Sequence, residues 1–226
     1  MTRGRRGAEP GDRKLRSARG RSQSSSRWLR RQLKDPYVEQ ARRLGYRSRA
    51  AFKLIELDDR FHLLRPGSRI VDLGAAPGGW TQVAVARARN GRVVSLDSGE
   101  MDPVPGATVL RHDANSEAAP AAITAALGGP ADLVMSDMAA PTTGHATTDH
   151  LRVVALAEAA FAIAREVLAP GGAFLAKVLR GGTERALLEA LRRDFAVVRH
   201  AKPPASRKES RELYVVATGF RGRGGA

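Results

Sequence analysis

A lysine inside an apolar stretch is the residue of this sequence whose position most strongly suggests chemistry. Lys177 lies in GGAFLAKVL (171–179), where every other side chain is absent, small or apolar. An unpaired charge is costly in such a strand, so a charge retained there usually serves a function. Asp137 ends the predicted strand DLVMSD (132–137), and ligands of open α/β sheets bind beyond the carboxyl ends of the strands. An ammonium and a carboxylate at that edge could move a proton or stabilise a developing charge.

A glycine-rich turn provides a second candidate site. In VDLGAAPGGW (71–80) an apolar run ends in small residues and glycines, which allow a tight turn and a close approach of the backbone to a ligand. The dinucleotide pattern G-x-G-x-x-G is not matched, because Ala75-Ala76-Pro77 fill its middle. Asp72, just before the turn, would also repel a phosphate. The ligand predicted for this turn is therefore not a pyrophosphate.

Two further acids follow predicted strands. Asp97 ends RVVSLD (92–97), where a carboxylate can accept both hydroxyls of a ribose. Asp113 follows ATVLR (107–111), where it could accept a hydrogen bond from an adenine amino group. A glycine-rich, acidic pocket suits a ligand with a ribose and a cationic or neutral centre, and S-adenosylmethionine has these properties. The alternative is that one of these acids only caps a helix or a turn.

These residues need a scaffold, and the sequence predicts an α/β fold. Strands and helices alternate from residue 69 onward, which is typical of βαβ units in a Rossmann-like, mostly parallel sheet with helices on both faces. Only a loop separates the last two of the seven strands, so the last strand is predicted to be antiparallel. The predicted strands are 69–73, 92–97, 107–111, 132–137, 172–179, 195–201 and 212–219. The predicted helices are 79–89, 117–127, 149–168 and 183–194, preceded by two or three short helices within 26–61, broken near Pro36.

The net charge of +15 is concentrated at the two ends of the chain. Residues 1–53 hold 17 Lys and Arg against 4 Asp and Glu, a net charge of +13, whereas residues 54–199 carry −2 and residues 200–226 carry +4. Basic arms bind polyanions through phosphate contacts and counterion release, which favours a nucleic acid as partner. Residues 1–26 contain little to bury and are predicted to be disordered. The alternative for this segment is a solubilising tail.

Several classes of protein are disfavoured by what the sequence does not contain. There is no cysteine, hence no disulfide and no thiolate chemistry. No apolar run approaches the ~18 residues of a membrane span, so we expect a cytoplasmic protein that does not bind membranes. The arginine- and serine-rich start weakly resembles an organellar transit peptide, but it lacks an apolar helical face. His145 and His150 have no further clustered ligands, and no metal is predicted.

Four motifs, in their order and spacing, resemble the FtsJ-type ribosomal RNA 2′-O-ribose methyltransferases. They are DLGAAPGGW, SDMA, AKVLRGGT and SRKESRELYVVATG, and the segment SSSRWLRRQLKDPYVEQARRLGYRSRAAFKL is also similar, so that the likeness runs from Ser24 to Gly219. The resemblance implies methyl transfer from S-adenosylmethionine to the ribose 2′-hydroxyl of a uridine in the A loop of large-subunit (23S) ribosomal RNA. We expect the RNA to be part of an assembled or nearly assembled 50S subunit, with free RNA as the alternative, and we expect a monomer.

The resemblance assigns a role to individual residues. It implies a catalytic Lys-Asp-Lys-Glu tetrad, which here is Lys53, Asp137, Lys177 and Glu212. It implies that the cofactor contacts Gly78, Trp80, Asp97, Asp113 and Asp137. Lys177 is then either a neutral base or a cation that steadies the developing alkoxide. From the residues alone, Lys53 could instead extend from a helix to solvent, and Glu212 could be a charge that protects a sheet edge.

The chain departs from the family pattern after SDMA, where Pro141 stands in a loop that usually contains an asparagine. The predicted domains are a disordered tail (1–26), a helical RNA-contacting segment (27–61), the methyltransferase domain (62–220) and a second disordered tail (221–226). The alternative function is a non-catalytic RNA-binding assembly factor with the same fold. A nucleotide-dependent oxidoreductase fits the fold but not the glycine-rich turn.

Overall fold

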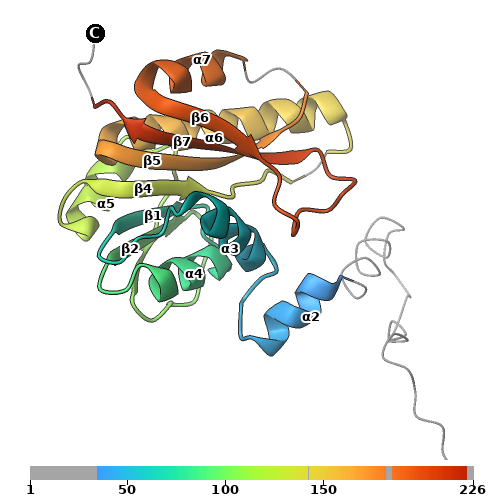
Figure 1. The fold of residues 1–226 in the computed structure, drawn as a ribbon, viewed down its shortest axis with the longest axis horizontal. Helices are drawn as coiled ribbons and strands as arrows, with labels where there is room; N and C mark the ends of the chain where they lie inside the picture. The colour runs from blue at the N-terminus through green and yellow to red at the C-terminus, as the bar shows by residue number, and fades with distance from the viewer. Residues whose placement is uncertain (1–34, 142, 182–184, 223–226) are drawn as a thin grey trace, which may run out of the picture.

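A single seven-stranded sheet with helices on both faces forms the body of the protein (Figure 1). The computed structural model describes residues 35–141, 143–181 and 185–222. The strands are β1 (Arg69–Leu73), β2 (Arg92–Asp97), β3 (Ala107–Arg111), β4 (Ala131–Ser136), β5 (Leu168–Leu179), β6 (Phe195–Ala201) and β7 (Glu212–Phe220). The helices are α2 (Pro36–Arg43), α3 (Ala50–Phe61), α4 (Gly79–Arg87), α5 (Ala119–Leu127), α6 (Ala146–Val167) and α7 (Arg185–Asp194). No helix in this part of the chain is both long and apolar enough to cross a membrane.

The order of strands in the sheet is β3-β2-β1-β4-β5-β7-β6. Strands β1 to β5 pair in parallel, and β7 pairs antiparallel with both β5 and β6. The predicted Rossmann-like sheet with an antiparallel last strand is confirmed. Because β7 lies between β5 and β6, Glu212 does not protect a sheet edge; β6 occupies that edge. The strands that follow β1 are added on one side of it (β2, β3) and then on the other (β4, β5). The order of strands therefore reverses between β1 and β4, and ligands of such sheets bind at this switch point.

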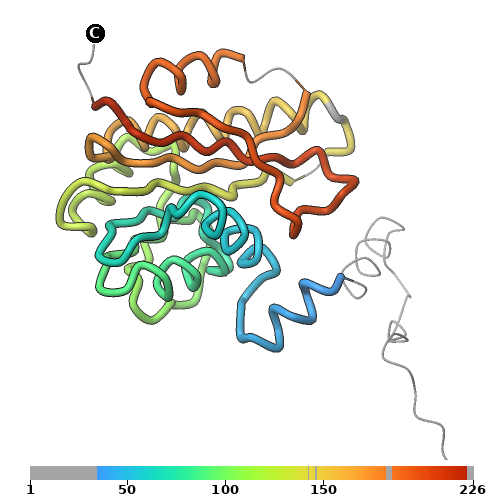
Figure 2. The backbone as a smooth tube through the Cα atoms, viewed as in Figure 1, coloured from blue at the N-terminus to red at the C-terminus, as the bar shows by residue number. Residues whose placement is uncertain are grey.

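Side chains point alternately to the two faces of the sheet along each strand, so the core has two layers. Val134, Phe174 and Val215 pack with α5, α6 and α7 on one face. Their strand neighbours Met135 and Leu175 pack with α3 and α4 on the other. Successive strand residues point to opposite faces, so Lys177, two residues after Leu175, points to the face that α3 covers. The backbone trace in Figure 2 shows the same layers.

The N-terminal helices begin where their sequence allows. Asp35 caps α2 by accepting a hydrogen bond from the Tyr37 backbone N–H at 3.1 Å, and Pro36 occupies the first helical position, where no N–H is needed. Pro36 therefore starts a helix. Helix α3 packs Leu54 and Leu57 into the same core cluster as β1 and β4. The domain boundary at residues 61 and 62 stays a prediction, as does the disorder of 1–26 and of the C-terminal tail, of which 223–226 also lie outside the described residues.

The predicted boundaries differ from the structure most clearly at β5. This strand begins at Leu168, four residues earlier than predicted, so Gly171-Gly172 do not separate helix from strand. The register with β4 shifts there, and Gly171 has φ +82°, a conformation that glycine adopts without strain. Strand β4 ends at Ser136, so Asp137 follows the strand directly. The other described ends differ from the predicted ones by three residues at most.

Candidate active site

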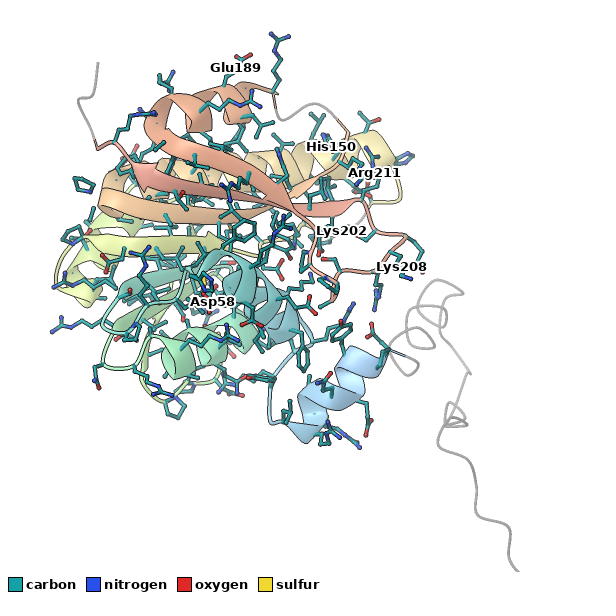
Figure 3. All side chains as sticks on the ribbon, in the orientation of Figure 1. Asp58, His150, Glu189, Lys202, Lys208 and Arg211 are labelled. Atoms are coloured by element: carbon teal, nitrogen blue, oxygen red, sulfur yellow. The ribbon has the colours of Figure 1, made fainter. Side chains whose placement is uncertain are left out.

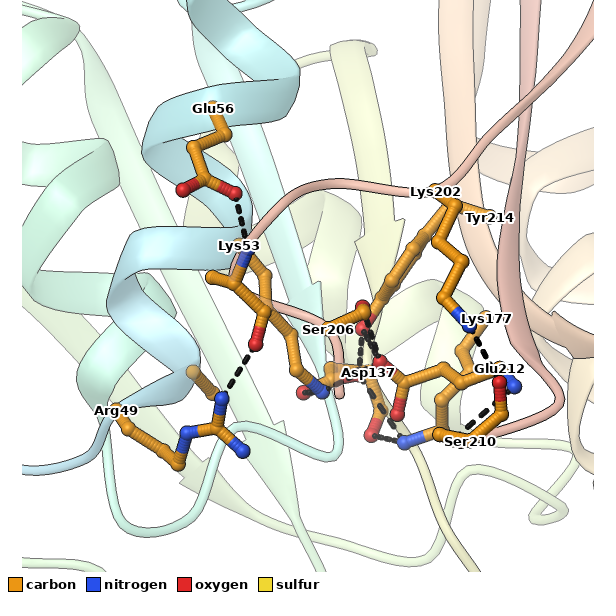
Figure 4. A network of polar contacts seen from close by, with 12 residues as sticks. Arg49, Lys53, Glu56, Asp137, Lys177, Lys202, Ser206, Ser210, Glu212 and Tyr214 are labelled. Atoms are coloured by element: carbon orange, nitrogen blue, oxygen red, sulfur yellow. Dashed lines mark hydrogen bonds and ion pairs between the residues drawn. The ribbon is translucent and has the colours of Figure 1, made fainter. Parts of the chain in front are cut away.

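Four side chains from four separate segments meet at the carboxyl edge of the parallel strands (Figure 4). Lys177 Nζ donates to Asp137 Oδ1 at 3.0 Å and to the Asp137 backbone carbonyl at 2.7 Å. Lys53 Nζ lies 2.8 Å from Glu212 Oε1 and 3.7 Å from Asp137 Oδ2. The structure therefore brings the residues of the predicted tetrad into one connected network of ion pairs.

The topology of the sheet explains why these residues meet. Asp137 follows β4, and Lys177 lies near the end of β5, the parallel neighbour of β4. Because β7 runs the other way, its first residue, Glu212, lies at the edge where β4 and β5 end. Lys53 reaches the same place from α3, where its side chain is only 11% exposed. Lys53 thus points into the protein and does not extend to solvent.

The charges of the tetrad set the ionisation of its carboxylate. Burial alone would raise the pKa of Asp137, but the nearby ammonium groups of Lys177 and Lys53 and a hydrogen bond from Tyr214 lower this pKa below its ordinary value. Asp137 is therefore a carboxylate at neutral pH. Burial, followed by the charges of Asp137 and Glu212, raises the pKa of Tyr214 well above its ordinary value of 10.0. The phenol keeps its proton and acts as a donor.

Two further residues belong to this network, Tyr214 and Ser206, and neither was predicted from the sequence as a site residue. The Tyr214 hydroxyl lies 2.6 Å from Asp137 Oδ1 and 3.3 Å from Glu212 Oε1. The Ser206 hydroxyl donates to the same Glu212 oxygen at 2.7 Å. Tyr214 could have been found, because it stands two residues after Glu212 on one strand and so shares its face. Ser206 begins the motif SRKESRELYVVATG, but no spacing there marks its hydroxyl as a partner of Glu212, which it reaches through a loop.

A cavity of about 380 Å³ opens beside the tetrad, at the switch point between β1 and β4 where the order of strands reverses. Most of its lining residues lie at or just after the ends of β1, β2, β3 and β4, among them Asp97, Asp113 and Asp137. Its described lining contains no lysine or arginine. Its volume is that of a small-molecule site. Three carboxylates suit a ligand with hydroxyls and a positive charge and disfavour a pyrophosphate, so the residues present fit S-adenosylmethionine.

Two of the acids also hold the loops that form the cavity. Asp97 accepts the backbone N–H of Ala76 at 2.9 Å and that of Gly99 at 2.8 Å, and so joins the loops after β1 and β2. A carboxylate has about four acceptor positions, which leaves Asp97 able to accept further hydroxyls. Asp113 Oδ1 accepts the backbone and side-chain N–H groups of Asn115, and these bonds lower the pKa of Asp113. Asp113 therefore holds a turn in addition to lining the cavity.

The glycines after β1 make room for protein atoms. Gly74 has φ +71°, and a Cβ there would collide with Met138. At Gly78, with φ +106°, a Cβ would lie 2.9 Å from Arg47 Nη1, and at Gly79 it would collide with Ser48. Gly74 also lines the cavity, and the close approach of a ligand to this turn stays a prediction. At least two of these glycines accommodate the segment between α2 and α3.

Gly78 and Trp80 are not among the residues that line the cavity. Trp80 is 3% exposed, donates its indole N–H to the Ala50 carbonyl at 2.8 Å, and places its ring centroid 5.8 Å from that of Tyr214. The tryptophan thus packs near Tyr214, whose hydroxyl contacts the tetrad residue Asp137. Cofactor contact by Gly78 and Trp80 stays a prediction.

The loop after Asp137 and the histidines complete the surroundings of the site. Asp149 accepts hydrogen bonds from the Thr143 and Gly144 backbone N–H groups just before α6. His145 precedes α6, but its side chain makes no capping hydrogen bond. Within 35–141, 143–181 and 185–222, no three His, Cys, Asp or Glu side chains gather in a way that could hold a metal ion. The absence of a metal stays an expectation.

The fold and the site together define a class of protein. An acidic cavity at the carboxyl edge of a Rossmann-like sheet, beside a cluster of two lysines and two carboxylates, suits a methyltransferase. Residues 46–220 match the family described as FtsJ-like methyltransferase. The chain belongs to this family.

Relatives and one solved structure agree with that assignment. The chain is 61% identical over 215 residues to a protein of Paramagnetospirillum magneticum named "Ribosomal RNA large subunit methyltransferase E", with 92% of this chain and 88% of the relative covered. A Rhodospirillum rubrum protein of the same name is 62% identical over 217 residues, covering 94% and 82%. A solved Plasmodium falciparum structure described as a ribosomal RNA methyltransferase is similar with a TM-score of 0.71 and 30% identity, covering 79% of this chain and all of that one.

Proposed function

We propose that this protein transfers a methyl group from S-adenosylmethionine to the ribose 2′-hydroxyl of a uridine in the A loop of large-subunit (23S) ribosomal RNA. The observation that carries the proposal is that Asp137 belongs both to the tetrad and to the lining of the acidic cavity. A methyl donor bound in the cavity would therefore lie next to the ammonium groups of Lys53 and Lys177, which would act on the ribose hydroxyl. The relatives named large-subunit methyltransferases support the choice of substrate.

The residues divide the chemistry between them. When bound, the cofactor supplies a methyl group that its positive sulfur already activates. A ribose hydroxyl is a weak nucleophile, so the protein must align it and stabilise the charge that develops on its oxygen. The Lys177 ammonium donates two hydrogen bonds to Asp137, one to its carboxylate and one to its backbone carbonyl. These two contacts fix the position of the Lys177 side chain, which acts on the 2′-hydroxyl either as a cation that steadies the developing alkoxide or as a neutral base.

The charge distribution and the relatives support a ribosomal substrate. The basic N-terminal part would contact phosphates, because the body of the chain at −2 attracts RNA poorly. In Figure 3, Lys202, Lys208 and Arg211 lie at the end of the sheet where α2 lies, and this end carries the tetrad. We propose a monomer acting in the cytoplasm on an assembled or nearly assembled 50S subunit. RNA docking by residues 1–26 is part of the same proposal.

The proposal is tested by methyl transfer in vitro. Purified protein, S-adenosylmethionine with a labelled methyl group and 50S subunits from a strain that lacks the corresponding activity should yield one labelled ribose in 23S RNA, located by mapping of 2′-O-methylation. Free 23S RNA and 30S subunits serve as comparison substrates. Label on a base, or no label on any large-subunit substrate, would refute the proposal.

Asp97 should be important for cofactor binding. We expect Asp97→Ala to weaken binding of S-adenosylmethionine at least about tenfold, because hydrogen bonds to a charged acceptor are worth ~1.5–3 kcal/mol each. Calorimetric titration measures the change. Asp132→Ala is the matched control, since Asp132 also accepts a backbone N–H, from Arg69 at 2.8 Å, but stands in β4 at the other end of the sheet. Equal affinities for wild type and Asp97→Ala would leave Asp97 only a loop-holding role.

A further inference from the structure

The loop between β6 and β7 is tightly held although it lies at the surface. Within residues 202–211, the backbone N–H of Ser206 donates to the Pro203 carbonyl at 2.9 Å, and that of Ser210 donates to the Arg207 carbonyl at 3.0 Å. Lys202 Nζ donates to the Ser210 carbonyl at 2.5 Å. Ser206 is only 3% exposed. Segments that are dynamic have few buried contacts, whereas this loop has these internal hydrogen bonds and a buried serine.

The N-terminal segment holds this loop from outside. The Ala205 peptide is bound on both sides, since its N–H donates to Glu56 Oε2 at 2.7 Å and its carbonyl accepts from the Arg49 guanidinium. Asp35 pairs with Arg49 at 3.1 Å and with Arg207 at 3.3 Å. Two acids and two arginines thus connect α2 and α3 to the loop. Of these, Arg49 and Glu56 are seen in Figure 4. The residue that follows the bound peptide is Ser206.

Ser206 transmits this constraint to the tetrad. Its hydroxyl donates at 2.7 Å to Glu212 Oε1, the same oxygen that lies 2.8 Å from Lys53 Nζ. Without Ser206, Glu212 would keep its ion pair with Lys53 at 2.8 Å but would lose its nearest hydroxyl donor, because the Tyr214 hydroxyl lies closer to Asp137, at 2.6 Å against 3.3 Å. A buried donor from a rigid loop fixes the carboxylate and, through it, the position of Lys53.

We propose that Ser206 is a positioning residue for methyl transfer, which acts by orienting Glu212 toward Lys53 and is itself held by Arg49 and Glu56. The inference rests on the methyltransferase activity proposed above. Ser206 is not among the residues that line the cavity, and its hydroxyl donates to Glu212, so its loss should affect the alignment of the methyl acceptor and leave cofactor binding unchanged. Misalignment of a reacting group lowers turnover more than ground-state affinity.

The test compares Ser206→Ala with Ser210→Ala, each measured for turnover on 50S subunits, KM for both substrates and thermal midpoint. Ser206→Ala should lower kcat by about tenfold, the effect of one hydrogen bond to a charged group, with KM values within twofold of wild type. Ser210 belongs to the same loop, but its hydroxyl accepts the Glu212 backbone N–H at 3.1 Å and does not touch the carboxylate. Ser210→Ala should therefore keep at least half of the wild-type kcat.

A double-mutant cycle separates positioning from general support of the fold. In a Glu212→Ala background, Ser206→Ala should change kcat less than twofold, because the carboxylate it orients is gone. Unchanged kcat for Ser206→Ala alone, an equal loss for Ser210→Ala, or a full tenfold loss in the Glu212→Ala background would each overturn the proposal. An inactive wild-type protein would instead refute the proposed function, and the two failures are thus distinguishable.

Discussion

Replacement of Lys177 by alanine is expected to reduce methyl transfer by about 10³-fold or more, the upper part of the range for a positioned proton-transfer or charge-stabilising group. Lys177 Nζ lies 3.0 Å from Asp137 Oδ1, beside the cavity but not among its lining residues. Affinity for S-adenosylmethionine should therefore stay within a few-fold of wild type. Single-turnover transfer to 50S subunits and calorimetric titration measure the two quantities. A variant that kept most of its turnover would remove Lys177 from the mechanism.

Two further variants sharpen this result. Lys208→Ala is the matched control, because Lys208 is exposed and its side chain makes no contact with the tetrad. Its turnover should stay close to that of wild type, apart from any loss of RNA affinity. Lys177→Arg separates the two roles of the ammonium, since arginine keeps the charge but does not give up its proton. Some activity in Lys177→Arg is expected if the residue stabilises the alkoxide, and none if it must act as a neutral base.

Asp72→Asn is expected to stabilise the protein, and to do so more strongly as pH rises. Asp72 is 1% exposed within β1, and its carboxylate accepts the Thr81 hydroxyl at 2.7 Å. Burial, with the negative charges of Asp137 and Asp97, outweighs the Thr81 hydrogen bonds and raises the pKa of Asp72 from 3.8 to about 7. Ionisation of this side chain therefore opposes folding. An asparagine can accept the same hydroxyl proton without a charge.

The sign of the pH dependence follows from the two pKa values. Well below pH 3.8 Asp72 is protonated in both the folded and the unfolded state, and its ionisation does not affect the free energy of unfolding. Between pH 3.8 and about 7 the unfolded chain has lost the proton while the folded protein keeps it, so stability falls as pH rises. Each tenfold change in a proton-binding constant corresponds to about 1.4 kcal/mol, so the total loss is on the order of 4 kcal/mol.

Chemical denaturation at pH 5 and at pH 8 measures this effect. The difference in free energy of unfolding between Asp72→Asn and wild type should grow by about 2–3 kcal/mol over that interval. Asp102→Asn, the same substitution at an exposed aspartate, should show no such growth. A constant difference between Asp72→Asn and wild type at the two pH values would mean that Asp72 ionises in the folded protein as it does in the unfolded chain.

Much of this site could be predicted because its signals are local. Lys177 is conspicuous as the one charge in an apolar strand, and Asp97, Asp113 and Asp137 all follow strand patterns. The alternation of strands and helices is enough to bring such strand ends to one edge of a sheet. The boundary of β5 was less predictable, because its first residues include a proline and two glycines that carry no strand propensity and pair with β4 only through an irregular register.

Other features depend on contacts between segments that are remote in the chain. The glycines at 74, 78 and 79 are recognisable as a tight turn, yet the atoms that fill the missing side-chain positions belong to Met138, Arg47 and Ser48. Tyr214 became part of the network because β5 and β7 pair in the register that places it opposite Lys177. Such partners are set by three-dimensional packing, which no periodicity within a segment encodes.

By itself, the sequence determined the class of fold, the acidic character of the cofactor cavity and the presence of an unusual buried lysine. Each of these follows from side-chain polarity and short-range spacing. Only the tertiary structure decided that β7 lies between β5 and β6, which turns Glu212 from a possible edge charge into the partner of Lys53. It also decided that Ser206, buried by a loop that α3 holds, donates to that carboxylate. The physical reason is that ion pairs and hydrogen bonds act over a few ångströms in space, whatever the separation along the chain.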